Sequence, residues 1–79
     1  MKNKEGIFVP GFLAFIVYNC VPYWDSDVGL NDPKGYLDHD EIVILIFLSE
    51  ASGARYWYVL SSQGPCFVYE SNLSLVRAN

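Results

Sequence analysis

The longest unbroken apolar run in the chain, Ile-Val-Ile-Leu-Ile-Phe-Leu at residues 42–48, is the feature that most constrains the fold. Acidic residues precede the run, and Ser49, Glu50 and Gly53 follow it, so it has the length of a strand. Its β-branched residues favour a strand over a helix. Because no position in the run is polar, we predict a strand that is buried on both faces.

The chain is short enough for a single domain, which we place at residues 7–79 after a polar tail at residues 1–6. A domain of 79 residues has a marginal core and often depends on disulfides, metals or a partner for stability. The composition is 52% hydrophobic and 16% aromatic, which excludes a disordered chain. The formal charge of -4 repels phosphate backbones, so we predict no nucleic-acid partner.

The order of turns and apolar segments predicts an all-β chain. Pro10-Gly11 reads as a turn before a strand at residues 12–21, and a long loop rich in Pro, Asp and Gly follows at residues 22–35. Ser52-Gly53 separates the run at 42–48 from an aromatic strand at 55–60, which indicates a hairpin. After a turn around Gly64, further strands are expected at 66–69 and 73–76, with residues 70–72 fitting one helical turn between them.

The second half of the chain resembles the bacterial Src-homology-three-like (SH3-like) family. That family shows a Gly-x-Leu segment, an alternating strand, a Trp-containing strand, a glycine turn, a Gly-Trp-Val triplet and a terminal leucine. The matching positions here are Gly35-Tyr36-Leu37, Val43, Leu45, Tyr56 or Trp57 with Val59, Gly64, Cys66-Phe67-Val68 and Leu73. The resemblance implies a small five-stranded SH3-like barrel with a long loop after the first strand.

Short proteins with this pattern are similar to uncharacterised products of tailed phages. The resemblance therefore implies a virion component or a protein of the host cytoplasm, and a cytoplasmic protein if the chain is not phage-encoded. Cys66 stands where the family has glycine, and the first half lacks the Asn-Val-Arg segment of many cell-wall-targeting members. The alternative function, a module that binds cell-wall glycan or proline-rich peptide, is weakened by the second departure.

The uncharged stretch at residues 6–24 superficially resembles a signal or anchor sequence. Pro10, Gly11, Asn19 and Pro22 interrupt it, and a spanning helix needs about 20 predominantly apolar residues. We therefore expect neither a signal peptide nor a transmembrane helix.

The residues that could carry chemistry do not form a recognisable motif. Asp25, Asp27 and Asp32 have the start of a calcium-loop spacing but lack its glycine and glutamate, and are expected to be solvated loop carboxylates. His39 has no second histidine or nucleophile beside it, and reads as a polar turn residue. We predict that the protein is not an enzyme and has no metal or cofactor.

The two cysteines, Cys20 and Cys66, have no paired spacing, and with only one histidine in the chain they cannot make a zinc site. A disulfide would need an oxidising compartment. We expect free thiols that fill space in the core.

The aromatic residues suggest either a ligand groove or core packing. Tyr23 and Trp24 lie in the long loop, and Tyr56 and Tyr58 share one face of the aromatic strand. Barrels of this family often bind peptides through aromatic grooves, so these four residues form a candidate groove. Packing is the competing explanation.

The run at 42–48 also predicts an interface. Relatives alternate apolar and polar residues there, so Val43, Leu45 and Phe47 should fill the barrel. The other face consists here of Ile42, Ile44, Ile46 and Leu48. Exposed side chains of this kind mark interaction sites, and we expect the segment at residues 7–9, another copy of the chain or a different protein to cover them.

Overall fold

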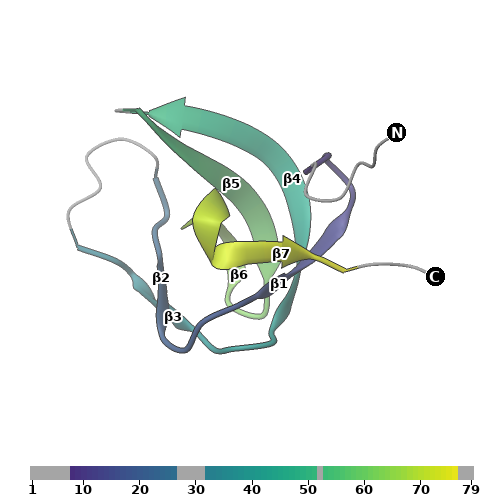
Figure 1. The fold of residues 1–79 in the computed structure, drawn as a ribbon. Helices are drawn as coiled ribbons and strands as arrows, with labels where there is room; N and C mark the ends of the chain where they lie inside the picture. Colours follow the sequence, from purple (N-terminus) through teal and green to yellow (C-terminus); the bar gives the residue numbers. More distant parts are fainter. Residues whose placement is uncertain (1–7, 27–31, 52, 77–79) are drawn as a thin grey trace.

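The structure, a computed structural model, describes residues 8–26, 32–51 and 53–76. These parts of the chain are all-β with one 3-10 turn, as predicted (Figure 1). The expected tail at residues 1–6 lies outside them. The elements in chain order are β1 (Leu13–Ile16), β2 (Val21–Tyr23), β3 (Gly35–Leu37), β4 (Ile42–Ala51), β5 (Ala54–Ser61), β6 (Gly64–Tyr69), η1 (Glu70–Asn72) and β7 (Leu73–Leu75).

The strands form a five-stranded antiparallel sheet in the order β6-β5-β4-β1-β7 and a two-stranded sheet of β2 and β3. The long strand β4 is therefore the middle strand, and it curves strongly across the molecule in Figure 1. The two sheets meet where Trp24 and Phe67 exchange backbone hydrogen bonds of 3.0 and 2.7 Å. This pair extends the end of β2 along the outer edge of β6.

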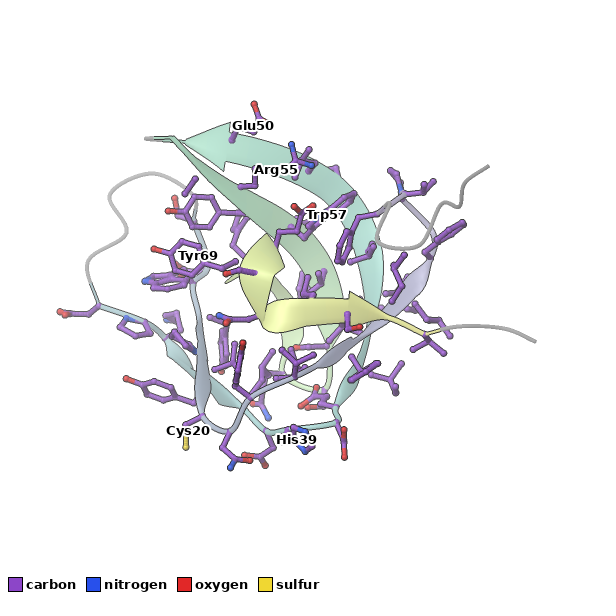
Figure 2. All side chains as sticks on the ribbon, in the orientation of Figure 1. Cys20, His39, Glu50, Arg55, Trp57 and Tyr69 are labelled. Atoms are coloured by element: carbon purple, nitrogen blue, oxygen red, sulfur yellow. The ribbon has the colours of Figure 1, made fainter. Side chains whose placement is uncertain are left out.

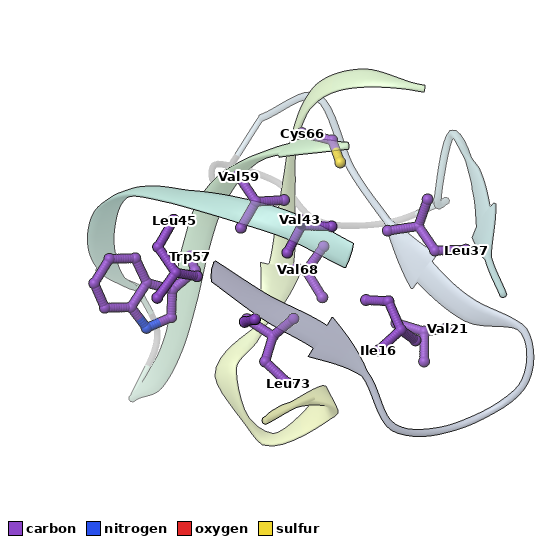
Figure 3. Close-up of a cluster of buried hydrophobic side chains, with 11 residues drawn as sticks. Ile16, Val21, Leu37, Val43, Leu45, Trp57, Val59, Cys66, Val68 and Leu73 are labelled. Atoms are coloured by element: carbon purple, nitrogen blue, oxygen red, sulfur yellow. The ribbon is translucent and has the colours of Figure 1, made fainter. Parts of the chain in front are cut away.

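The main core lies on the inner face of the sheet, where alternate residues of each strand meet. Trp57 and Val59 of β5 point into it with Val43 and Leu45 of β4 (Figure 3). Phe8, ahead of β1, packs against the same core, with its ring centroid 6.2 Å from that of Trp57. The buried members are Ala14, Ile16, Val21, Leu37, Val43, Leu45, Trp57, Val59, Cys66, Val68 and Leu73.

A β-bulge in β4 reverses the predicted orientation of two side chains. Leu45 pairs with Val59, but Phe47 rather than Ile46 pairs with Tyr58. The extra residue shifts the alternation by one position, since two residues of β4 then oppose one of β5. Phe47 is therefore exposed and not in the barrel core as predicted, while Leu48 packs partly buried against the main core.

The predicted first strand at residues 12–21 is wrong in its extent. The chain leaves β1 after Ile16 and starts β2 at Val21, with Cys20 between them at a φ of 56°. A residue in the left-handed region cannot continue an extended strand. The expected loop at residues 22–35 is shorter at both ends, because β2 pairs with β3 through Val21 opposite Leu37.

The other turns match the sequence. Gly53 and Gly64 have φ of 79° and 94° and lie at the β4–β5 and β5–β6 turns, where glycine adopts this conformation at low cost. The predicted helical turn is the 3-10 turn η1. It delivers the chain into β7, which pairs with β1.

The bulge can be tested by truncating one residue on each side of the strand. Leu48→Ala should lower the free energy of unfolding by about 2 kcal/mol because it removes a side chain that packs on the core, whereas Ile46→Ala should cost less than about 1 kcal/mol. Urea denaturation measures both values. Equal losses, or a larger loss for Ile46→Ala, would contradict the observed register.

Candidate functional site

A row of apolar side chains crosses all five strands on the outer face of the sheet. Leu13 of β1 pairs with Ile44 of β4, which pairs with Leu60 of β5, which pairs with Pro65 of β6. On the other side Val76, just after β7, donates its N–H to the carbonyl oxygen of Leu13 at 3.0 Å. The side chains of Leu13, Ile44, Leu60 and Val76 are each 40 to 45% exposed, and Pro65 is exposed as well. We call these five residues the aliphatic row.

Further apolar residues of β4 continue this surface. Ile42 lies two positions before Ile44 on the same face, and the bulge leaves both Ile46 and Phe47 exposed after it. With the aliphatic row, these three residues form what we call the apolar face. Such a contiguous exposed patch is typical of an interaction site.

The predicted interface is thus only partly on one surface. Ile42, Ile44 and Ile46 lie exposed on the outer side of the sheet, but Leu48 turns to the core and Phe47 occupies its place. The contributions of β1, β5 and β6 and of Val76 after β7 were missed, since cross-strand neighbours depend on register. Alternation within residues 13–16 and 54–61 could have shown which residues share a face, but not which ones meet.

The aromatic residues form a second cluster on the same outer side. Trp24, Tyr56 and Phe67 are buried there, with Tyr58 and Tyr69 partly buried against them. Tyr56 stacks on Tyr69 with ring centroids 4.7 Å apart, and the ring of Trp24 meets that of Tyr69 edge-on at 5.3 Å. The cluster is therefore a packed layer of aromatic rings.

The aromatic cluster is continuous with the apolar face through Phe47. Its ring stacks on Tyr58 at 5.0 Å, and Tyr58 in turn lies 4.7 Å from Phe67. One end of the outer surface is thus a layer of packed rings, and the other end is mainly aliphatic, with Phe15 beside Ile42.

Three of the four predicted groove residues, Trp24, Tyr56 and Tyr58, come together in the aromatic cluster. Tyr23 is partly buried against the main core instead, and its ring lies so close to Gly35 that an added Cβ there would be 2.7 Å from the hydroxyl oxygen. The Nε1 of Trp24 is buried, and no described residue accepts a hydrogen bond from it. The ligand groove stays a prediction, and packing accounts for the burial of Trp24 and Tyr56.

A charged network fastens η1 to β5 at the end of the sheet near the β4–β5 turn (Figure 2). Arg55 donates from Nε and Nη2 to both carboxylate oxygens of Glu70, at 2.9 and 3.2 Å, and from Nη1 to Glu50 at 2.9 Å. The buried indole of Trp57 donates to Glu70 Oε2 at 2.7 Å. Glu70 thus makes a bidentate contact with Arg55 and also accepts the hydrogen bond of the Trp57 indole, the one polar group of that buried side chain.

These contacts shift the acid–base properties of the network. Hydrogen bonds from Arg55, joined by the bond from Trp57, lower the pKa of Glu70 below its usual value of 4.5. The hydrogen bond and charge of Glu70 raise the pKa of Arg55. A cavity of about 480 Å³ lies beside the network and is bordered by Phe8 and Tyr69. Because its charged groups already pair with one another, the cavity wall offers no unpaired charge to a ligand.

The remaining candidate residues lie apart from each other. The described part of the chain contains no group of three or more His, Cys, Asp or Glu residues that could hold a metal ion. His39 Nδ1 lies 3.2 Å from Asp40 at the surface, and Asp25 lies 3.7 Å from Lys34. Asp32 is exposed. Asp27 is outside the described residues, so the calcium-loop spacing is not testable as a whole.

The two cysteines are free and differ in their surroundings. Cys66 is buried in the core, as expected, and its Sγ lies 3.6 Å from the hydroxyl of Ser61. Burial raises the pKa of the Cys66 thiol. Cys20 is exposed at a turn and does not fill core space, so that prediction was wrong for this residue.

Comparisons with protein-family models, curated proteins and solved structures found no significant match to this chain. The parts of the chain that the structure describes contain no helix with the length and hydropathy needed to cross a membrane.

The Glu70 network makes stability depend on pH. Because the folded state lowers the pKa of Glu70, its contribution is fully present above the usual carboxyl pKa of 4.5 and is lost as the pH falls through the lower folded-state value. Glu70→Gln should cost about 1–2 kcal/mol of unfolding free energy at pH 7 and much less in acid.

Urea denaturation between pH 7 and pH 2 measures this dependence. Glu50→Gln is the matched control, because Glu50 makes a single surface contact with the same arginine. A Glu70→Gln effect that is constant over this pH range would contradict the assigned role.

The thiols should differ in reactivity. In the native protein, Cys20 should react with a disulfide reagent within seconds, and Cys66 only at the rate of unfolding, since its thiol is buried and stays protonated. Cys20→Ser should remove the fast phase completely. Two thiols of similar rate in the native protein would contradict the buried position of Cys66.

Proposed function

We propose that this chain is a non-catalytic module that binds protein through the apolar face of its sheet. The observation that carries the proposal is the exposure of Ile42, Ile44 and Ile46 on the middle strand, joined on both sides by exposed apolar residues of the neighbouring strands. Leaving an aliphatic side chain in water forgoes roughly 1.5 to 3 kcal/mol relative to full burial. A surface of this kind is stabilised when a partner covers it.

The framework of the proposal is a small SH3-like β-barrel. Three features support it: the five-strand order with the last strand beside the first, the 3-10 turn just before the last strand, and the Trp24–Phe67 bridge between the two sheets. The proposed setting is a larger assembly, such as a tailed-phage particle, in which the chain serves as a small structural subunit.

Residues 8 and 9 offer little cover for the apolar face. Ile7 is outside the described residues, Phe8 packs on the main core beside Trp57, and Val9 is itself exposed. This favours a second molecule as the covering element.

The alternative of a glycan or proline-rich peptide binder is less well supported. Its candidate residues Trp24 and Tyr56 are buried by packing within the aromatic cluster. At the other end of the outer surface, Phe15 beside Ile42 is partly buried, and the aliphatic row adds no ring on which a sugar could stack.

The double variant Ile44→Thr, Ile46→Thr tests the proposal. Threonine keeps the strand propensity while removing apolar surface, so the barrel should stay folded by circular dichroism and urea denaturation. The double variant should bind the assembly isolated from the native source at least tenfold more weakly than the original chain does. Sedimentation velocity measures both affinities.

Tyr36→Thr is the matched control, since Tyr36 is exposed on β3, away from the apolar face. It should assemble like the original protein. Assembly that is equally strong for the double variant would overturn the proposed function.

A further inference from the structure

We propose that the partner on the apolar face is a second copy of this chain, which packs face to face to form a symmetric dimer. This inference depends on the proposed function, because it names the occupant of the same surface. Three observations support it: the order of side chains in the aliphatic row, the absence of charge on the outer side of the sheet, and the size of the exposed area.

The aliphatic row reads nearly the same from both ends. Its order across the sheet is Val76, Leu13, Ile44, Leu60, Pro65, with Ile44 on the middle strand. A two-fold axis that runs along β4 between two facing sheets places Ile44 against Ile44, and Leu13 against Leu60. Leu13 of each copy thus faces Leu60 of the other, which is the reciprocal pairing of a self-complementary interface.

The curvature of the sheet limits which members touch. The sheet curves strongly along β4 (Figure 1). Because the outer face of a curled sheet is convex, the middle strands approach most closely, and Val76 and Pro65, at the two ends of the aliphatic row, lie at the rim. The contact is therefore centred on Ile44, with Leu13 and Leu60 on either side. Ile42, Ile46 and Phe47 extend it along β4.

No described strand position on the outer side of the sheet carries a charged side chain. A partner must therefore present an uncharged contact surface, since a charge buried there would have no opposite charge to pair with. A second copy supplies such a surface. Each copy carries a formal charge of -4, so the two copies repel each other at long range and salt should strengthen the dimer.

The exposed area is sufficient for a weak dimer. Full burial of one apolar side chain removes on the order of 100 Å² of apolar surface from water, so the six residues in the contact, each about 40 to 50% exposed, offer roughly 260 Å². Interfaces are about 60% apolar, which gives about 450 Å² per copy, in the range of weak and transient interfaces. The expected dissociation constant is therefore in the micromolar range.

Sedimentation equilibrium of the purified full-length chain tests the inference, at concentrations from about 1 μM to 500 μM. We expect a monomer–dimer equilibrium that tightens from low to high salt. Ile44→Thr should weaken it at least tenfold and Ile44→Asp should abolish it, whereas Tyr36→Asp should leave it unchanged. Leu60→Asp provides a second disrupting variant if Ile44→Asp fails to fold.

Cross-linking tests the symmetry. In a Cys20→Ser background, a short bismaleimide should join Ile44→Cys chains to each other. It should also join Leu13→Cys to Leu60→Cys in a mixture more efficiently than it joins either variant to itself. Tyr36→Cys chains should not be joined above the rate of random collision. Self-linking of Leu13→Cys in preference to the mixed product would overturn the proposed axis.

Failure of the dimer can be told apart from failure of the proposed function. A purified chain that stays monomeric at 500 μM, or a dimer that Ile44→Asp and Leu60→Asp leave intact, overturns this inference. If the assembly from the native source still loses affinity in the Ile44→Thr, Ile46→Thr variant, the apolar face binds a different protein and the proposed function stands. If the purified chain stays monomeric and the native assembly binds the Ile44→Thr, Ile46→Thr variant as tightly as the original chain, both proposals fail.

Discussion

The structure depends on one strand, β4, which is apolar on both faces and lies in the middle of the five-stranded sheet. Its inner residues Val43 and Leu45 are fully buried, and the neighbouring strands β1 and β5 bring their own alternate residues to the same core. The outer residues receive no such cover from the described part of the chain. The same apolar strand therefore supplies side chains to the core on its inner face and leaves apolar side chains exposed on its outer face.

The bulge in β4 determines which of its side chains face the core and which face outward. Without it, Phe47 would point to the core and Leu48 to solvent; with it, the smaller leucine packs beside Trp57 and the phenylalanine ring joins Tyr58 outside. Trp57 and Phe8 already occupy that end of the core, so two large rings leave limited room for a third. The bulge also increases local twist, which suits a strongly curved strand.

Much of the fold followed from local patterns. The residues that predicted turns, Gly53 and Gly64, are at turns with positive φ, and β5 between them alternates as expected. The predictions that were wrong, the orientation of Phe47 and Leu48 and the extent of the first strand, depended on how the strands pair. Nothing in the letters of residues 42–48 marks a bulge, because its cause lies in ring packing with residues far along the chain. Similarly, Cys20 is not a turn residue by type, yet the chain reverses there so that β2 can pair with β3.

For the candidate site, the sequence predicted which residues of one strand share a face but not which residues of other strands lie beside them. Alternation identified Ile42, Ile44 and Ile46 as a set, but the register that adds Leu13 and Leu60 is a property of the assembled sheet. The same is true of the Glu70 network, because η1 reaches Arg55 and Trp57 only when β6 returns beside β5. The sequence around Glu70 predicts a polar helical turn but does not predict that Glu70 binds the indole of Trp57.

The edges of the sheet explain why association should use the face. A strand edge with free backbone groups is the usual route to unwanted pairing, and proteins block it with short or covered edge strands. Here β7 is three residues long, and the outer edge of β6 is met by the backbone of Trp24. Edge pairing at either side of the five-stranded sheet is therefore restricted. The side chains of the apolar face, by contrast, stand on hydrogen-bonded central strands and include β-branched isoleucines with few rotamers. Such side chains lose little conformational entropy on binding, which makes contact between the uncharged outer faces the less costly way to cover β4.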